Sequence, residues 1–277
     1  MTNLYARLGD VKGDVTGLQS AVAAGTDASY LRDIADASRA FEKDCNGRYF
    51  YAYRATRYFH GDGDTTLSLP HDLISVTTLT VDTNGDGVAD LTLVEGTDFW
   101  LRPDAAGQRG EPYWQIDLIP WGLQLSSWPS GARAIAITGL WGWSYEIEST
   151  GLTGTLADAT DTSLVSSATA SALIFPGDVA VQEDEQMYVS AVSGITVTVQ
   201  RGINGTVAVA HAAKAISIRR YPRDIEGAIK RRVIAKRWSD RAGMPLGEPG
   251  KGYDLSYAVY MDVVKSYRDK TAWIGSF

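Results

Sequence analysis

The segment DTNGDGVAD, residues 82–90, spaces its side-chain oxygens in a way that suits a calcium ion. A carboxylate or amide oxygen recurs at alternate or near-alternate positions, and Gly87 stands where such a loop turns sharply. The oxygens that make up this candidate metal site belong to Asp82, Asn84, Asp86 and Asp90.

The residues around this segment favour a turn over a calcium loop. A helix–loop–helix site needs a glutamate at position twelve, which here is Leu93, and Glu95 comes two places late. The flanking LTV and LTL are typical of strands. We therefore expect the tip of a β-hairpin, with Asn84-Gly85 or Asp86-Gly87 supplying the positive φ angles.

Other motifs of catalysis are missing from the sequence. His60, His71 and His211 each lack a second histidine or cysteine at ligand spacing, and there is no GxSxG elbow or phosphate-binding glycine loop. We therefore predict no cofactor and no enzymatic activity. A hydrolase that uses acids such as Asp98 or Glu185 is the third of our hypotheses.

Two further groups of residues indicate contact rather than chemistry. Six of the eight tryptophans fall between residues 100 and 143, where they are expected to fill a β core or an interface, with a sugar-stacking platform as the alternative. Residues 223–241 hold seven basic and three acidic side chains in an acidic protein. This helix is either a docking or DNA-facing surface, or a face that is solvated or ion-paired with an acidic neighbouring subunit. Its candidate contact residues are Lys230, Arg231, Arg232, Lys236 and Arg237.

Composition indicates a folded protein. The chain has 277 residues, 44% apolar and 21% charged, with a formal net charge of −7. This acidity disfavours a generally basic nucleic-acid binder, and no apolar run is long enough for a transmembrane helix. Cys45 is the only cysteine, and the N-terminus lacks the pattern of a signal peptide, so we expect folding in a reducing cytoplasm.

Hydrophobic periodicity predicts helices near both ends of the chain. In residues 26–47 the apolar side chains recur every three or four positions, after a capping Thr26 or Asp27 and before the stop Asn46-Gly47. Residues 224–241 and 253–269 show similar helical spacing. Between these helices, strands broken by the turn sequences HGDGD, LPHD, TNGDG and WPSG predict a sandwich or small barrel.

The expected fold is therefore α+β, a helical bundle built from both chain ends with two inserted β-rich modules. Its predicted parts are a helical segment at residues 1–48 and a β-rich platform at residues 49–150. They are followed by a second β module at residues 151–222, which opens with a weakly specified low-complexity tract, and by C-terminal helices with an apolar tail at residues 223–277.

The order of several short segments resembles the head–tail adaptor, or connector, proteins of tailed double-stranded DNA phages and gene transfer agents. The second β module is similar to an insert found in some relatives. The resemblance covers most of the chain and rests on Gly47, Arg48 and Phe50; Tyr58, Phe59, Gly61 and Gly63; Leu69, Pro70, Asp72, Ile74 and Ser75; Gly96, Thr97 and Asp98; and Gly139, Trp141, Gly142 and Trp143.

This resemblance implies a structural protein of the virion neck, made in the host cytoplasm. Such adaptors form a ring, usually of twelve copies, that joins the portal to the tail or to a stopper protein. DNA passes through the ring without sequence-specific binding, which suits an acidic protein. The C-terminal segment of relatives docks on the portal, and packing back onto the chain's own helices is the alternative here. The portal contacts implied for this chain are Tyr267, Trp273, Ile274 and Phe277.

A second hypothesis comes from a different class of protein. The tryptophans and the strands also suit a carbohydrate- or receptor-binding β protein of a phage tail or cell surface. Helices at both ends of the chain argue against it, because a pure binding module rarely needs both termini in one bundle. Sugar binding that quenches tryptophan fluorescence would distinguish it from the adaptor.

Overall fold

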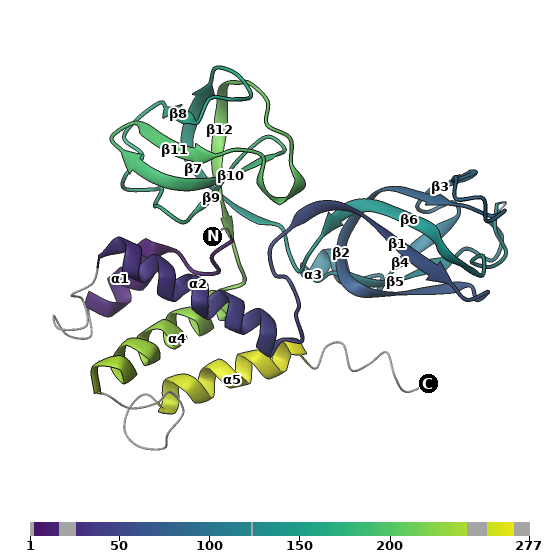
Figure 1. Ribbon diagram of the computed structural model, residues 1–277, viewed down its shortest axis with the longest axis horizontal. Coiled ribbons are helices and arrows are strands. Elements are labelled where there is room, and N and C mark those ends of the chain that lie inside the picture. Colours follow the sequence, from purple (N-terminus) through teal and green to yellow (C-terminus); the bar gives the residue numbers. More distant parts are fainter. Residues whose placement is uncertain (1–2, 17–25, 123, 243–253, 269–277) are drawn as a thin grey trace. The chain divides into compact units, whose positions relative to one another are not determined.

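The computed structural model describes residues 3–16, 26–122, 124–242 and 254–268. The fold is mixed α and β with more strand than helix (Figure 1). The chain divides into two compact units, and each is described by itself. Residues 1–47 with 146–277 form the first, here named the barrel unit, and residues 48–145 form the second, here named the open-sheet unit.

The barrel unit contains the long helices. They are α1 (Leu8–Thr16), α2 (Asp27–Asp44), α4 (Arg223–Ala242) and α5 (Asp254–Arg268). The predicted start and stop of α2 are confirmed: Thr26 accepts a hydrogen bond from the Ser29 amide, and Asn46 and Gly47 both have positive φ. The predicted helices at 224–241 and 253–269 are also confirmed, to within one residue at each end.

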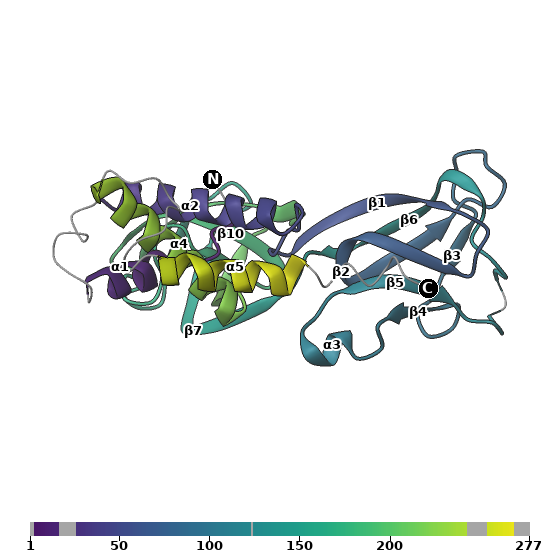
Figure 2. The ribbon, with the colours of Figure 1, turned by 90° about the horizontal axis from the view of Figure 1, so that it is seen from below.

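Helices α2, α4 and α5 lie side by side in both views (Figures 1 and 2). The Phe41 ring of α2 contacts Tyr260 and Tyr267 of α5 edge-on, with ring centroids 5.9 and 6.2 Å apart. Lys236 of α4 binds Asp33 of α2 at 2.8 Å. No helix in the described part of the chain is both long and apolar enough to cross a membrane.

Six strands of the barrel unit close into a ring in the order β10-β11-β8-β7-β12-β9. They are β7 (Glu146–Leu156), β8 (Ser163–Ser166), β9 (Val179–Gln182), β10 (Glu185–Ser193), β11 (Thr196–Gln200) and β12 (His211–Arg220), with the short helix η1 (Ile203–Gly205) between β11 and β12. All ladders in this ring are antiparallel. The small-barrel alternative therefore holds for the second β module, whereas the first β module, for whose strands we also expected a sandwich or small barrel, is an open sheet.

The barrel begins earlier than we expected, and its first strands lie in a tract that we took as weakly specified. Leu152, Leu156 and Leu164 are buried, so apolar side chains do alternate in this Thr- and Ser-rich stretch. Gly154 is also an inward position, where a Cβ would lie 2.6 Å from Leu164 and 2.8 Å from Ile216. A glycine is thus required at position 154 by the narrow interior of a closed barrel.

The open-sheet unit is one twisted antiparallel sheet in the order β1-β6-β2-β5-β4, with β3 paired to β2. Its elements are β1 (Tyr53–Gly61), β2 (Thr66–Val81), β3 (Leu91–Leu93), β4 (Phe99–Arg102), α3 (Ala106–Arg109), β5 (Tyr113–Leu118) and β6 (Gly131–Trp141). Trp128 and Trp141 are fully buried in its core, and their ring nitrogens donate to the carbonyls of Thr65 and Ala55.

One predicted turn in this unit is wrong. LPHD, residues 69–72, lies inside the single long strand β2, where the sequence suggested a break between two strands. What changes near these residues is the pairing partner of the strand. β2 pairs with β5 up to Leu73 and with β6 from Leu73 onward, with a bulge between Ser68 and Leu73. Pro70 lacks an N–H and so fits the bulge rather than a continuous ladder.

Candidate functional site

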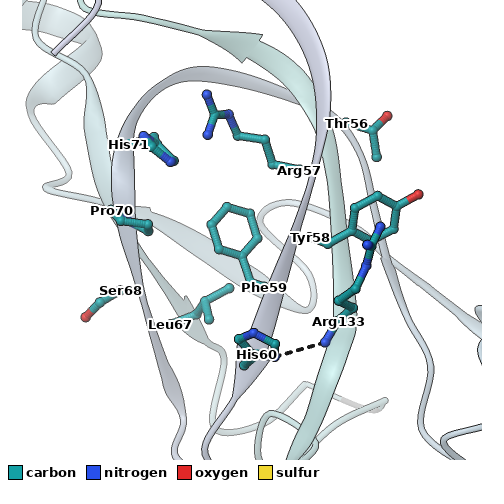
Figure 3. A pocket seen from close by; sticks show the side chains of 10 residues that line it. All are labelled: Thr56, Arg57, Tyr58, Phe59, His60, Leu67, Ser68, Pro70, His71 and Arg133. Carbon is teal, nitrogen blue, oxygen red and sulfur yellow. Dashed lines mark hydrogen bonds between the residues drawn. The ribbon is translucent and has the colours of Figure 1, made fainter. Parts of the chain in front are cut away.

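A hollow of about 580 Å³ lies between β1 and the first half of β2 in the open-sheet unit (Figure 3). Arg57 and Phe59 of β1 point into it, and His71 and Leu67 reach it from β2 (Figure 3). Arg133 borders it from β6. Four basic side chains and no carboxylate line this hollow; its lining residues are Thr56, Arg57, Tyr58, Phe59, His60, Leu67, Ser68, Pro70, His71 and Arg133.

Arg57 is held rigidly but is not saturated with hydrogen bonds. Its guanidinium lies 5.5 Å from the ring centroid of Tyr53 and 5.3 Å from that of Trp141, and Nη2 donates to the Tyr53 hydroxyl. Nε is buried and has no acceptor among the residues that the structure describes. Burial and the nearby charge of Arg57 together lower the pKa of His71. An anion in the hollow would relieve both effects.

A bulge in β6 brings the second arginine to the hollow. Between Phe59 and Gly61 the ladder to β6 slips, and Arg133 adopts a positive φ of 60° there. Its guanidinium lies 4.1 Å from the ring centroid of Tyr58, and its backbone amide donates to His60 Nδ1 at 3.1 Å. The exposed face of Tyr58 and the charge of Arg133 thus form one rim of the hollow.

Four residues of the family resemblance meet at the base of the open-sheet unit. Arg48 binds Asp72 at 2.8 Å, and its guanidinium lies 4.7 Å from the ring centroid of Trp143. The Gly142 amide donates to the Asp72 carbonyl, and the Trp143 amide donates to the Tyr49 carbonyl. Burial raises the pKa of Asp72 to about 6, although Arg48 opposes the shift. We name the cluster Arg48, Asp72, Gly142 and Trp143 the basal clasp.

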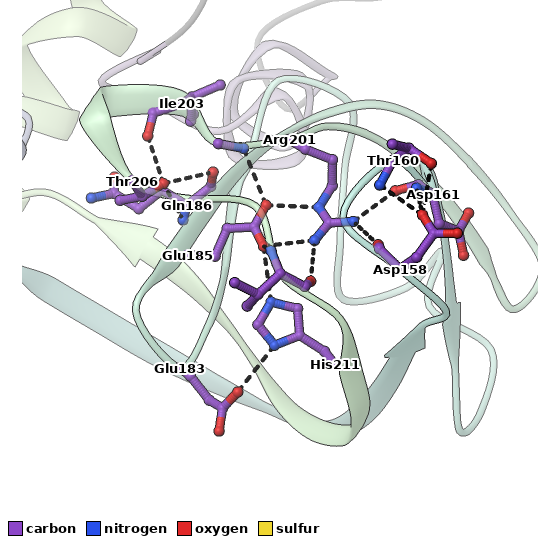
Figure 4. Close-up of polar contacts among 12 residues, drawn as sticks. Asp158, Thr160, Asp161, Glu183, Glu185, Gln186, Arg201, Ile203, Thr206 and His211 are labelled. Carbon is purple, nitrogen blue, oxygen red and sulfur yellow. Dashed lines mark hydrogen bonds and ion pairs between the residues drawn. The ribbon is translucent and has the colours of Figure 1, made fainter.

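The barrel unit holds a second polar cluster, which is fully satisfied (Figure 4). Glu185 accepts from Arg201 through both carboxylate oxygens at 2.7 Å, and His211 Nε2 lies 2.9 Å from it. The other ring nitrogen of His211 lies 3.1 Å from Glu183. The remaining N–H groups of Arg201 reach the carbonyls of Asp158, Asp161 and Val209.

This barrel cluster is structural in character. Burial opposes ionisation of Glu185, but the hydrogen bonds from Arg201 and His211 outweigh it and lower its pKa. Neither His211 nor the other two histidines contacts a serine or cysteine side chain in the part of the chain that the structure describes. The hydrolase hypothesis gains no nucleophile from this geometry. Asp98, its other candidate acid, is buried and accepts the Val94 amide in a turn.

The predicted hairpin at 82–90 is confirmed, since β2 and β3 pair antiparallel on either side of it. Gly85 and Gly87 both have positive φ. The candidate metal ligands are engaged by the loop itself: Asp82 accepts the amides of Gly85 and Gly87, Asn84 that of Asp86, Asp86 that of Val88, and Asp90 that of Thr83. No group of three metal-ligating side chains occurs within the described ranges.

Three candidate contact residues of the basic helix are paired inside their own unit. Arg232 binds Asp44, Lys236 binds Asp33 and Asp36, and Arg237 binds Asp33. Arg231 is exposed and Lys230 is half-buried. Most of this positive charge is therefore matched by the carboxylates of α2. We expected ion pairing with a neighbouring subunit, whereas these three residues form their ion pairs within the chain.

Of the four implied portal contacts, the structure describes only Tyr267, and Trp273, Ile274 and Phe277 lie outside the described residues. Tyr267 is buried, and its hydroxyl lies 2.8 Å from the Asp224 carboxylate. Burial and this hydrogen bond raise the pKa of Tyr267. For this residue the structure favours the alternative that we left open, packing onto the chain's own helices.

The tryptophans divide between core and surface. Trp128, Trp141 and Trp143 are buried, as the core interpretation expects. Trp121 is 73% exposed and meets Trp100 edge-on, with an interplanar angle of 75°. A sugar-stacking platform needs an open ring face rather than an edge-on pair.

No family model matches the chain, and no curated protein matches it either. Among solved structures, a chain described as the neck of an empty GTA particle computed with C6 symmetry is similar to it. The two share 19% sequence identity over 52% of this chain and 69% of the other, with a TM-score of 0.34. A likeness of this size carries no conclusion about function.

Proposed function

We propose that this chain is a structural subunit of a virion neck, without enzymatic activity and without a cofactor. Copies of it form a ring, twelve in number by resemblance to adaptors, between the portal and the tail or a stopper protein. DNA passes through the ring without sequence-specific binding. Helices from both chain ends make up one bundle in this proposal, and the apolar C-terminal segment docks on the portal.

The basal clasp is the observation that carries the proposal. Three of the short segments on which the family resemblance rests are far apart in the sequence, near residues 48, 72 and 142. In the open-sheet unit these segments meet through the Arg48–Asp72 ion pair and the stacking of Arg48 on Trp143. Residues that matched the family by order alone therefore share one structural task, which supports a common fold for this unit.

Electrostatics agree with a passage for DNA. The chain carries a formal net charge of −7, and the basic residues of α4 with described partners are paired with acids of α2. The inner surface of a DNA channel should carry few unpaired cations, because each cation that bound a phosphate would hold the DNA in place.

Electron microscopy of the purified chain mixed with the portal protein of the same genome tests this proposal. We expect a second ring stacked on the portal ring. A matched sample that lacks residues 271–277 separates the two parts of the proposal: loss of the stacked ring assigns the dock to the tail, and its survival moves the dock to the helices. A chain that stays monomeric and never meets the portal would refute the adaptor function.

A further inference from the structure

The hollow beside β1 is a gap between two strand edges. β1 pairs with β6, and the first half of β2 pairs with β5, so each has one edge without a ladder among the strands that the structure describes. The two strands follow each other in the chain, joined by a turn at residues 62–65, and they border the hollow from opposite sides (Figure 3). A strand edge without a ladder offers a row of backbone donors and acceptors to another chain.

The side chains along this gap define what it would accept. Phe59 and Leu67 give it an apolar floor, and both belong to the core of the unit. The cationic side chains of Arg57 and Arg133 also line the gap, together with His60 and His71. Two nearby acids are engaged elsewhere, since Asp62 accepts the Asp64 amide and Asp72 binds Arg48. The gap is therefore positively charged, and none of its lining residues in the described chain is a carboxylate.

We propose that this gap receives one extended acidic segment of a partner protein. The segment pairs with the edge of β1 as an added strand, and its carboxylates bind Arg57 and Arg133. Its alternate apolar side chains lie on Phe59 and Leu67. The buried Nε of Arg57, which has no acceptor in the described chain, gains one in this complex.

A peptide fits these observations better than a phosphate or a nucleic acid. Phosphates would meet the cations, but they have no N–H and C=O groups in the alternating pattern that a strand edge pairs with. An extended peptide supplies the backbone groups, the alternating apolar side chains and the charge together. This inference does not depend on the neck function, because it rests only on the gap.

The test uses the full chain and a fluorescent peptide, TEVEVET, whose binding is followed by fluorescence anisotropy. Two control peptides are a version with N-methyl groups on alternate residues, which keeps the charge but removes backbone donors, and TKVKVKT, which reverses the charge. We expect TEVEVET to bind. Each control peptide should bind at least about tenfold more weakly than TEVEVET. Because these comparisons use the unaltered protein, a variant that fails to fold cannot obscure them.

Variants then locate the binding site. Arg57→Gln and Arg133→Gln should each weaken TEVEVET binding about tenfold. Arg109→Gln removes an exposed arginine of the same unit outside the hollow and should leave binding unchanged. Tryptophan fluorescence during urea unfolding confirms that each variant is folded.

Three results would overturn the inference. Equal binding of the N-methylated peptide would show a purely ionic contact without strand pairing. No binding of TEVEVET at about millimolar concentration would exclude the acidic segment. Self-association of the chain that Arg57→Gln abolishes, seen by sedimentation, would assign the gap to a second copy instead.

Discussion

The closed barrel and the open sheet have similar strands but differ in their strand edges and in the surroundings of one buried arginine each. In the barrel, every strand edge finds a neighbour, and the buried Arg201 uses all its donors on Glu185 and backbone carbonyls. In the sheet, β1 keeps a free edge, and Arg57 beside it has a buried Nε without an acceptor. The barrel thus closes its strand ladders by itself, whereas the sheet leaves the edge of β1 for another molecule.

The two units can be followed separately in one unfolding experiment. Six of the eight tryptophans lie in the open-sheet unit, and the helices longer than one turn in the described chain lie in the barrel unit. Tryptophan fluorescence therefore reports mainly on the open sheet, and circular dichroism at 222 nm reports mainly on the barrel unit. The predictions below use these two signals.

The largest effect is expected in the barrel cluster. Glu185→Ala leaves Arg201 and His211 buried without their carboxylate, which should lower the free energy of unfolding of the barrel unit by about 3–5 kcal/mol. Glu183→Gln is the control, because Glu183 is 49% exposed and its pairs should contribute far less than those of Glu185. Urea unfolding followed at 222 nm measures both. Equal losses would mean that the cluster is not the closed unit that its geometry indicates.

A second large effect should appear in the basal clasp. Gly142 has φ of 120°, and a Cβ there would lie 2.1 Å from the Tyr51 carbonyl oxygen. Gly142→Ala should therefore destabilise the open-sheet unit by about 2–4 kcal/mol, because the backbone must shift. Gly85→Ala is the matched control, with positive φ but open space around it, and should lose only about 1–2 kcal/mol. Tryptophan fluorescence during urea unfolding distinguishes the two.

The clasp should also make the open sheet sensitive to pH. The pKa of Asp72 rises from 3.8 to about 6 on folding, so the folded state binds more protons than the unfolded state between these values. The stability that Asp72 contributes is therefore greatest below about pH 4 and falls as the pH rises to about 6, by up to about 3 kcal/mol. Asp72→Asn removes this dependence.

The measurement is the difference in unfolding free energy between the Asp72→Asn variant and the unaltered chain, taken by tryptophan fluorescence from pH 4 to pH 7. The variant should gain relative stability as the pH rises through this window. A flat difference would mean that the Arg48 ion pair fully offsets the burial of Asp72.

The smallest effect is expected at the open edge. Arg57→Gln removes a half-buried side chain that makes one hydrogen bond and two ring contacts, so the open-sheet unit should lose only about 1 kcal/mol. Fluorescence-detected unfolding checks this value. A loss as large as that of Glu185→Ala would show that Arg57 stabilises the fold, and the contrast between the two units would then disappear.

Local patterns predicted the helices and the hairpin because their signals lie within a few residues. Helix α2 follows from its cap, its apolar spacing and its Asn46-Gly47 stop, and the 82–90 turn follows from its glycines. The partner switch within β2 was missed because LPHD describes only a local break. Which strand lies on either side of a bulge depends on ladders with residues about 40 and 70 positions away.

The hollow was missed for a similar reason. Arg57, His71 and Arg133 are distant in sequence, and none belongs to a motif. The aromatic and basic residues of YAYRATRYFH were a usable signal, because charged side chains are common on edge strands. The missing ladder between β1 and β2 could not be read from it. Two consecutive strands joined by a short turn would ordinarily pair as a hairpin.

The basal clasp has a mechanical consequence. It ties the two ends of the open-sheet unit together, since the Trp143 amide binds the Tyr49 carbonyl and Arg48 binds Asp72. If the two ends were pulled apart, the force would act first on that hydrogen bond and that ion pair, which would break in turn. The strand ladders beyond them would bear no load until both had broken. The resistance of this unit to stretching therefore depends on a few contacts at its base and hardly on the size of its sheet.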